Sequence, residues 1–301
     1  KSVDNVEKVY IMRLINHDKT FYQKAKGKWL MEIGYTVWEW GLETENDLKT
    51  ALNDLKELGY HNFENFIGMA DLYEGREEEF NRLVKDYGLK FIALYNYIRD
   101  MDADNVEEAK KYLEFCKKTG AKIMNIQAPA RDGKPSEEHL LKLSGILDEI
   151  GRMAQDYGVA LCLHPHFQMT VEQEDEIDFV AEHTNPEYVK FCFDTAHTVL
   201  AGIDFQKLFE KYKGRIGCIH LKDQDTEVDV KDYRQKWIHE WDRHQRFYEL
   251  GTKGIDFPKV LELLENTGYD GYLVIENDTP TVSNYEGAKT NREYAVRVLG
   301  L

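Results

Sequence analysis

Apolar and polar positions along the chain follow two alternating periods, one typical of buried strands and one typical of amphipathic helices. Short apolar runs bounded by polar turns predict strands that are buried on both faces. Between them, apolar residues recur every three or four positions, as in Leu48, Leu52 and Leu55, which predicts helices. The expected strands are 30–37, 61–67, 90–97, 122–127, 159–164, 188–194, 215–221 and 271–276. The expected helices are 44–58, 77–87, 105–119, 136–157, 172–183, 204–212, 257–267 and 285–299.

This alternation amounts to eight strand-then-helix units, most of them with a glycine, such as Gly88 or Gly120, between the helix and the next strand. Such a repeat predicts a parallel sheet. Eight nearly even units over about 250 residues favour a closed (β/α)₈ barrel, the TIM barrel, and a doubly wound sheet is the alternative. We therefore expect an α/β protein with one TIM barrel over residues 29–301. Residues 1–28 are polar and charged, and we expect an N-terminal arm there.

Four consecutive strands end in a residue that binds metal ions well. These residues are His164, Asp194, His220 and Glu276. Because the active site of such a barrel lies at the carboxyl ends of its strands, the four side chains are expected to meet there. Mixed nitrogen and oxygen donors predict one divalent cation, and the ligand set alone does not choose among the candidates. These are Mn²⁺, Co²⁺, Zn²⁺, Fe²⁺ and Mg²⁺, of which we favour Mn²⁺ or Zn²⁺. The alternative is that each residue is a separately satisfied polar group at a strand end.

The spacing between these residues locates an insertion. Asp194 follows His164 by 30 residues and His220 follows Asp194 by 26, whereas Glu276 follows His220 by 56. The excess falls in 224–255, an extended loop after the seventh strand that contains several aromatic residues. A loop of this kind above a barrel is typical of a lid that covers the site. Packing against a second subunit is the other interpretation, so a homo-oligomer stays open.

Charge and composition narrow the partners. The formal net charge is −16 and the isoelectric point is near 5.1, which argues against affinity for nucleic acid or for anionic membranes. No apolar run approaches the roughly 18 residues that a membrane span needs. We expect a cytoplasmic protein. Since the chain begins at Lys1 without a methionine, a processed or exported form stays open.

The four cysteines, at 116, 162, 192 and 218, never form a CxxC pair. Three of them lie two residues before an expected ligand and therefore share its face of the strand, one layer deeper. A thiolate metal site is one interpretation. We favour small apolar filling in a reduced protein.

The carboxyl-terminal half resembles a known family. The segments that carry the resemblance are Asp-Thr-Ala-His (194–197), His-Leu-Lys-Asp (220–223), Glu-Leu-Gly-Thr-Lys-Gly-Ile-Asp-Phe (249–257) and Gly-Tyr-Leu-Val-Ile-Glu (271–276). Together they resemble the sugar phosphate isomerase/epimerase superfamily of xylose-isomerase-like barrels. The resemblance covers most of residues 30–300 and is specific from the fifth strand onward.

In that superfamily a glutamate, an aspartate, a histidine and a glutamate on strands five to eight hold the metal, and the last three correspond to Asp194, His220 and Glu276. His164 stands in place of the first glutamate, so the strand-five ligand is either His164 or His166. His-Pro-His at 164–166 is similar to the inosose dehydratase branch. Epimerases of the superfamily use two metal-bound glutamates as an acid/base pair, and this chain lacks one of them.

The resemblance implies enolisation of a keto sugar or keto polyol by an isomerase or epimerase, or by a related lyase. Glu276 or His166 is the expected base. Lys222 is expected to supply a proton, and His197 to bind a substrate hydroxyl. For His166, His197 and Lys222, the alternative is a surface or supporting role.

Four further residues are expected to bind the carbohydrate. Glu64 resembles the second-strand glutamate of the superfamily, Arg131 and Gln127 follow the fourth strand, and Trp38 is suited to stacking on a sugar. Core or interface packing is the alternative for Trp38. Two other functions compete with a sugar enzyme. One is an endonuclease for abasic DNA, against which the charge counts, and the other is a barrel that binds sugars without catalysis.

Overall fold

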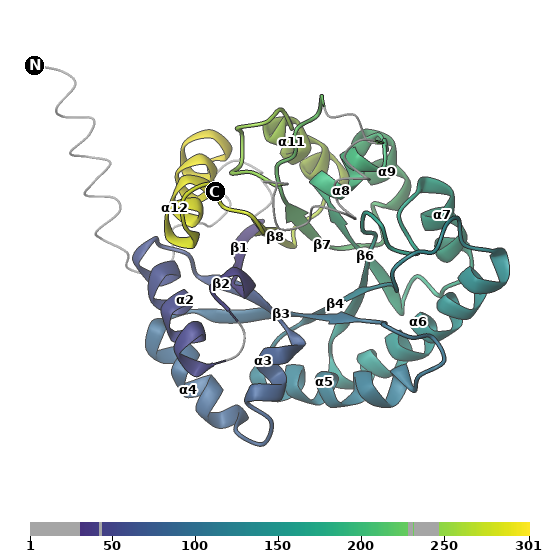
Figure 1. The fold of residues 1–301 in the computed structure, drawn as a ribbon, viewed down its shortest axis with the longest axis horizontal. Coiled ribbons are helices and arrows are strands. Elements are labelled where there is room, and N and C mark those ends of the chain that lie inside the picture. The colour runs from purple at the N-terminus through teal and green to yellow at the C-terminus, as the bar shows by residue number, and fades with distance from the viewer. Residues whose placement is uncertain (1–30, 42–43, 228–230, 232–246) are drawn as a thin grey trace, which may run out of the picture. The chain divides into compact units, whose positions relative to one another are not determined.

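The computed structural model describes residues 31–41, 44–227, 231 and 247–301. Its eight strands are all parallel and close into a barrel in the order β1 to β8, with β8 beside β1. This confirms the predicted TIM barrel, and Figure 1 shows the strands as an inner ring inside a ring of helices. The strands are β1 (Glu32–Thr36), β2 (Asn62–Phe66), β3 (Lys90–Tyr97), β4 (Ile123–Gln127), β5 (Ala160–His164), β6 (Val189–Asp194), β7 (Ile216–Leu221) and β8 (Tyr272–Ile275).

The helices follow the strands as the apolar spacing predicts. They are α2 (Glu45–Glu57), α3 (Ile67–Leu72), α4 (Glu77–Tyr87), α5 (Asn105–Thr119), α6 (Glu137–Tyr157), α7 (Glu174–Glu182), α8 (Thr195–Leu200), α9 (Phe205–Tyr212), α11 (Phe257–Thr267) and α12 (Asn284–Tyr294), with a 3₁₀ turn η1 (Trp38–Trp40) and a π-helical turn η3 (Ala295–Leu299). The expected strands and helices agree with observed ones to within two residues at each end, except that the expected helix 285–299 is divided into α12 and η3. The short helices η1, α3 and α8 were not predicted. None of the helices in the described part of the chain is long and apolar enough to cross a membrane.

Two predictions fall largely outside the described residues. The N-terminal arm, 1–28, lies there entirely, and so does most of the loop 224–255. The described ends of that loop are held in place by Asp223, whose carboxylate accepts hydrogen bonds from the backbone N–H groups of Gln224, Thr252 and Lys253 at 2.8, 2.8 and 3.0 Å.

Local capping fixes where the helices start and stop. Thr44 and Asp47 form a reciprocal capping box at the start of α2, which satisfies backbone N–H groups that have no partner within the helix. Gly88 and Gly120 end α4 and α5 in the left-handed conformation, with φ of 74° and 86°. A side chain is strained in that conformation, so glycine allows the chain to turn directly into the next strand.

The barrel has a small inner core and a larger outer core between strands and helices. The inner core contains Ile92, Ala93, Ile123, Cys162, Cys192, Cys218 and Val274. All four cysteines are buried and free, as expected for apolar filling. Pairing of β6 with β7 places Cys192 beside Cys218 and, two residues further on, Asp194 beside His220. The titratable residues therefore form a layer directly above the cysteines, at the carboxyl end of the barrel.

Candidate metal centre

Three of the four expected ligands come together at the carboxyl end of the barrel. One donor atom each from Asp194, His220 and Glu276 lies within 4.8 Å of the others, and all three residues are buried. His220 Nδ1 is 2.7 Å from Glu276 Oε2. Asp194 Oδ2 is buried without a hydrogen-bond partner among the described residues, and the closest ammonium, Lys222 Nζ, is 3.8 Å away. The group is therefore a buried set of oxygen and nitrogen donors with unused acceptor capacity.

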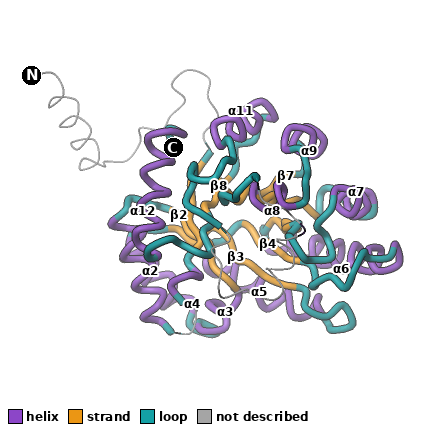
Figure 2. The backbone as a smooth tube through the Cα atoms, turned by 45° about the horizontal axis from the view of Figure 1, so that its top comes forward, coloured by secondary structure: helices purple, strands orange, loops and turns teal. Residues whose placement is uncertain are grey.

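The unexpected helix α8 explains how Asp194 is aimed. Asp194 is the N-cap of α8, and its Oδ1 accepts a hydrogen bond from the backbone N–H of His197 at 2.8 Å. A capping carboxylate is fixed in orientation because one oxygen is committed to the helix. The other oxygen is left for the centre of the barrel. Figure 2 shows α8 beside the ends of the inner strands, and α8 contacts both β6 and β7.

His164, the fourth expected ligand, does not join this group. It meets His220 and Cys192 in one set of donors, and His166 and His197 in another, each within 4.8 Å. The Nδ1 atom of His164 is buried without a hydrogen-bond partner in the described part of the chain. Burial and the neighbouring His220 keep the pKa of His164 well below its usual value, so the ring is neutral.

The rings of His166 and His197 lie against each other at the rim of the site, tilted by 39°. Their ring centroids are 3.7 Å apart, and His166 Nδ1 contacts the carbonyl oxygen of Phe167 at 2.6 Å. Burial lowers the pKa of His166 to about 4 and holds the pKa of His197 well below its usual value. Both imidazoles are therefore neutral near pH 7, suited to exchanging hydrogen bonds with hydroxyl groups rather than to binding an anion.

Lys222 is fully buried among carboxylates. Its Nζ lies 2.5 Å from Glu276 Oε1, 2.9 Å from Asp278 Oδ2 and 3.4 Å from His197 Nε2. Burial alone would lower the pKa of Lys222, but the charges of Asp278, Glu276 and Asp194 outweigh it and raise the pKa above its usual value. Phe247, at the end of the long loop, covers the ammonium with its ring centroid 4.1 Å from Nζ.

Asp278 is the residue of this site that the sequence reasoning missed. It joins Lys222 to Trp38, whose indole Nε1 donates a hydrogen bond to Asp278 Oδ1 at 3.0 Å. These contacts hold the pKa of Asp278 below its usual value despite its burial. Its place two residues after Glu276, on the same face of the chain, is the signal that identifies it.

Trp38 and Gln127 lie among aromatic side chains. Trp38 stacks on Phe66 with a centroid distance of 4.2 Å and an interplanar angle of 20°, and Tyr95 meets it edge-on at 5.7 Å. Gln127 Oε1 accepts a hydrogen bond from the Tyr95 hydroxyl at 2.7 Å. Tyr95 in turn stacks on His220 at 6.2 Å, so this aromatic group borders the ligands.

Glu64 and Arg131, both expected to bind substrate, are engaged by other residues. Glu64 is fully buried, with its Oε2 2.9 Å from His220 Nε2. Arg131 Nη1 donates to Glu172 Oε2 at 2.7 Å, Nη2 pairs with Glu176, and Nε donates to the Gly133 carbonyl at 3.1 Å. Arg131 therefore contacts none of the expected ligands. The loops after β4 and β5 bring its guanidinium to two other buried residues, Glu172 and Glu176.

The pKa values of all three grouped ligands are raised. Burial raises the pKa of Asp194, and burial together with the charge of Asp278 raises the pKa of Glu276 to about 7. Burial lowers the pKa of His220, but the charge of Glu64 and hydrogen bonds to Cys218, Glu276 and Glu64 raise it well above its usual value overall. Excess negative charge in a buried site attracts either protons or a cation.

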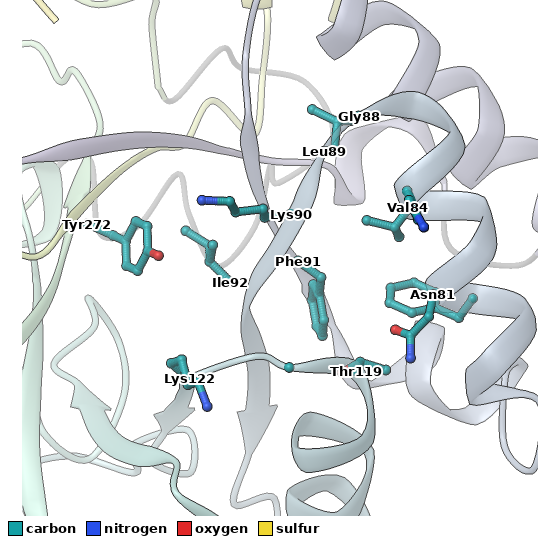
Figure 3. Close-up of a pocket in the computed structure, with 13 residues that line it drawn as sticks. Asn81, Val84, Gly88, Leu89, Lys90, Phe91, Ile92, Thr119, Lys122 and Tyr272 are labelled. Carbon is teal, nitrogen blue, oxygen red and sulfur yellow. The ribbon is translucent and has the colours of Figure 1, made fainter. Parts of the chain in front are cut away.

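A separate cavity of about 440 Å³ lies at the opposite end of the barrel, where β3 and β8 begin. Figure 3 shows Lys90, Ile92 and Tyr272 on one side of it and Asn81 and Val84 of α4 on the other. None of the expected site residues lines it. Its lysines lie beside the carboxyl ends of α4 and α5, where a positive charge offsets the helix dipole. The candidate site is therefore the buried group and not this cavity.

The fold agrees with the comparisons to known proteins. The chain belongs to the xylose isomerase-like TIM barrel family, whose model matches residues 52–297. It is 30% identical over 216 residues to the inosose dehydratase of Geobacillus thermodenitrificans (strain NG80-2), which covers 66% of this chain and 72% of that protein. It is 27% identical over 266 residues to the inosose dehydratase of Clostridium perfringens, covering 77% and 88%. The crystal structure of the IolI protein with a bound zinc atom superposes with a TM-score of 0.73 at 20% identity, covering 90% and 98%.

Proposed function

We propose that this protein is a divalent-metal-dependent enzyme that enolises a keto sugar or keto polyol and then eliminates water from it. The observation that carries the proposal is the meeting of Asp194, His220 and Glu276 within 4.8 Å at the carboxyl end of the barrel. The relatives named inosose dehydratases support the choice of elimination.

The residues fit a divalent cation. Two carboxylates and one imidazole are the donors that Zn²⁺, Mn²⁺ and Fe²⁺ accept, and three protein ligands leave room for substrate oxygens. Asp194 Oδ2 supplies a buried acceptor without a partner among the described residues. Three carboxylates, of Asp194, Glu276 and Asp278, surround the single ammonium of Lys222, so negative charge is in excess. His164 is not grouped with these three ligands, although its Nδ1 is buried without a partner among the described residues.

A bound cation supplies Lewis-acid polarisation of the substrate carbonyl, which acidifies the neighbouring carbon. Glu276 is the residue that we propose takes the proton from that carbon. Its Oε1 lies against Lys222 Nζ at 2.5 Å, and the ammonium stabilises the carboxylate before the transfer.

The second half of the reaction is the loss of a β-hydroxyl. The C–O bond breaks, its electrons remain with the departing oxygen, and one proton is added, so that the substrate loses water overall. Lys222 is held protonated and is the proposed donor of that proton. His166 and His197 are neutral and lie 3.7 Å apart at the rim, where we propose that they bind hydroxyl groups of the substrate. Trp38 and Gln127 are proposed to border the carbohydrate ring.

Isomerisation or epimerisation is the competing outcome of the same enolisation. Epimerisation requires a second proton donor on the opposite face of the carbon that was deprotonated, whereas a 1,2-isomerisation delivers the proton to the neighbouring carbon and can use a single base. The strand-five position, where the superfamily has its second glutamate, holds the neutral His164. A neutral imidazole of low pKa is a poor acid, which favours elimination over inversion.

The test uses the purified full-length protein, stripped of metal with a chelator and reloaded separately with Zn²⁺, Mn²⁺, Co²⁺, Fe²⁺ or Mg²⁺. Bound metal is counted per chain, and keto inositols and keto sugars are assayed in D₂O for exchange at the α-carbon and for dehydrated product. We expect one cation per chain, metal-dependent exchange and a dehydrated product. Product epimers without dehydration would replace the lyase by an epimerase, and a protein that binds no cation would overturn the proposal.

A further inference from the structure

We infer that Glu64 is a positioning residue that determines which nitrogen of His220 is offered to the cation. The inference rests on the proposed function, since it assigns a role within that site. It replaces the substrate-binding role that the resemblance implies for Glu64. It also explains why a carboxylate is buried in the barrel below the ligands.

The contacts of Glu64 commit both of its oxygens. Oε2 lies 2.9 Å from His220 Nε2, and Oε1 accepts a hydrogen bond from Asn125 Nδ2 at 2.8 Å. The opposite edge of the same imidazole, Nδ1, lies 2.7 Å from Glu276 Oε2. Glu64, His220 and Glu276 therefore form a line in which the imidazole separates a deep carboxylate from one that is a proposed ligand.

With a cation beside Glu276, this line leaves one tautomer of His220. A carboxylate can only accept hydrogen bonds, so His220 must carry a proton on Nε2 to satisfy Glu64. When a cation takes the place of the remaining proton, the lone pair that binds it is on Nδ1, the edge that faces Glu276. Metal-binding histidines commonly donate their other N–H to a carboxylate, which fixes the ring and increases its basicity.

Burial argues against contact between Glu64 and a substrate. Glu64 is 0% exposed to solvent. One of its carboxylate oxygens lies within 4.8 Å of the Cys218 sulfur and of a ring nitrogen of His220. Cys218 belongs to the inner core beneath the ligand layer. A substrate that approaches from the open carboxyl end reaches Glu276 and the rim imidazoles and finds His220 between itself and Glu64.

The charge of Glu64 is otherwise uncompensated. In the described part of the chain, no lysine or arginine lies within ion-pair distance of it, and its ion-pair contact is His220. Burying a carboxylate without a cation is costly. A divalent cation bound to Nδ1 of His220 would add positive charge to the imidazole that Glu64 contacts, and so would help to compensate the buried carboxylate of Glu64.

The experiment compares Glu64→Gln and Glu64→Met with the wild-type protein. Zinc affinity is measured by competition with a chelator, and KM and kcat are measured at saturating zinc. The histidine ring nitrogens of the zinc-loaded protein are followed by NMR after ¹⁵N labelling. Glu172→Gln is the matched control, because Glu172 is also a fully buried glutamate near this end of the barrel but contacts Arg131.

Glu64→Met should weaken zinc binding by roughly 10–100-fold, the usual effect of losing the carboxylate behind a ligating histidine. Glu64→Gln should recover part of that loss, because its amide oxygen still accepts the Nε2–H. The NMR spectrum should show His220 protonated on Nε2 in the wild type, with that proton exchanging faster in Glu64→Met. KM at saturating zinc should stay near the wild-type value, and Glu172→Gln should leave zinc affinity unchanged.

The inference is overturned if Glu64→Met binds zinc as tightly as the wild type, or if KM rises while zinc affinity is unchanged. It is also overturned if Glu172→Gln weakens zinc binding as much as Glu64→Gln does, since the effect would then be structural. Failure of the proposed function is seen separately, in a wild-type protein that binds no zinc. If Glu64→Met does not fold, Glu64→Gln and the wild-type tautomer decide the question.

Discussion

Two buried ion clusters follow neighbouring strands at the carboxyl end of the barrel, and they differ in how completely their polar atoms are satisfied. The Arg131 cluster consists of Arg131, Glu172 and Glu176. Glu176 Oε2 also accepts the backbone N–H groups of Glu172 and Gln173 at 2.9 and 2.8 Å. Each charged group of this cluster therefore has a partner within the protein.

The Lys222 cluster consists of Lys222, Asp194, Glu276 and Asp278, and it is incomplete. Asp194 Oδ2 has no hydrogen-bond partner in the described part of the chain, and the same holds for Nδ1 of the adjoining His197. One ammonium faces three carboxylates. Most buried polar atoms in proteins are hydrogen-bonded, so unsatisfied ones in a charged cluster point to a ligand.

The difference teaches how to separate structural from functional buried charge in this fold. Both clusters contain a cation between glutamates or aspartates, and a count of ion pairs would not distinguish them. The Arg131 cluster is complete and joins the loop after β4 to the start of α7. The Lys222 cluster has spare acceptors and spare negative charge, and we propose that a cation and a substrate complete it.

The sharpest test of the comparison is Glu276→Gln, which keeps the shape but removes the proposed base and one ligand charge. We expect turnover to fall by roughly 10²–10⁴-fold, the loss typical of a missing general base. Exchange of the substrate α-proton with D₂O should fall in parallel. The measurement is kcat at saturating metal together with deuterium incorporation.

Glu262→Gln on the exposed surface of α11 is the control and should leave turnover unchanged. If Glu276→Gln keeps wild-type exchange, the base is another residue, and the Lys222 cluster loses its proposed catalytic role.

The opposite behaviour is expected from Arg131→Met. This change leaves Glu172 and Glu176 buried without their cation, and breaking a buried ion pair in this way typically costs about 3–5 kcal/mol of folding free energy. KM and kcat of the folded fraction should change little. Urea unfolding and steady-state kinetics measure the two effects. A tenfold or larger rise in KM with unchanged stability would show that Arg131 binds substrate after all.

A smaller effect is expected from His166→Ala, which removes one rim imidazole next to the Lys222 cluster. If His166 binds a substrate hydroxyl through a neutral hydrogen bond, its loss costs about 0.5–1.5 kcal/mol, at most about a tenfold loss in kcat/KM. Metal content and α-proton exchange should persist. The exposed His139→Ala serves as the control. Loss of α-proton exchange in His166→Ala would make His166 the base instead of Glu276.

The barrel itself could be predicted because its signals are local and repeated. Each strand is a short apolar run, and Gly88 and Gly120 mark helix ends through a backbone conformation that glycine tolerates best. Since parallel strands align their carboxyl ends, the meeting of Asp194, His220 and Glu276 follows from the fold and three strand-end residues. Those three positions needed no knowledge of loops.

The remaining contacts depend on side-chain directions that strand periodicity does not encode. Arg131 could not be assigned to Glu172 and Glu176 because that pairing depends on the paths of two loops. His164 is buried as expected, but its ring lies among His166, His197 and His220 rather than with all three grouped ligands. Asp278 could have been found from its spacing to Glu276. The capping of α8 by Asp194 could not be predicted, because α8 is too short to show helical periodicity in the sequence.

The smallest expected effect on stability and activity is that of a change at Cys192, which lies beneath the proposed ligands. This change tests whether the metal centre extends below Asp194, His220 and Glu276. The sulfur atom of Cys192 lies within 4.8 Å of a nitrogen of His164 and a nitrogen of His220, an arrangement that would also suit a metal ion. Cys192 nevertheless belongs to the apolar inner core. Burial holds the pKa of its thiol well above the usual value. A thiol that stays protonated is a poor ligand.

Cys192→Ala should therefore lower the free energy of unfolding by about 1 kcal/mol, as a modest loss of packing does, while metal content and turnover stay at wild-type values. Urea unfolding, metal analysis and kcat of this variant make the test, with Cys116→Ala in the outer core as the matched control. A loss of bound metal in Cys192→Ala but not in Cys116→Ala would extend the metal centre into the cysteine layer.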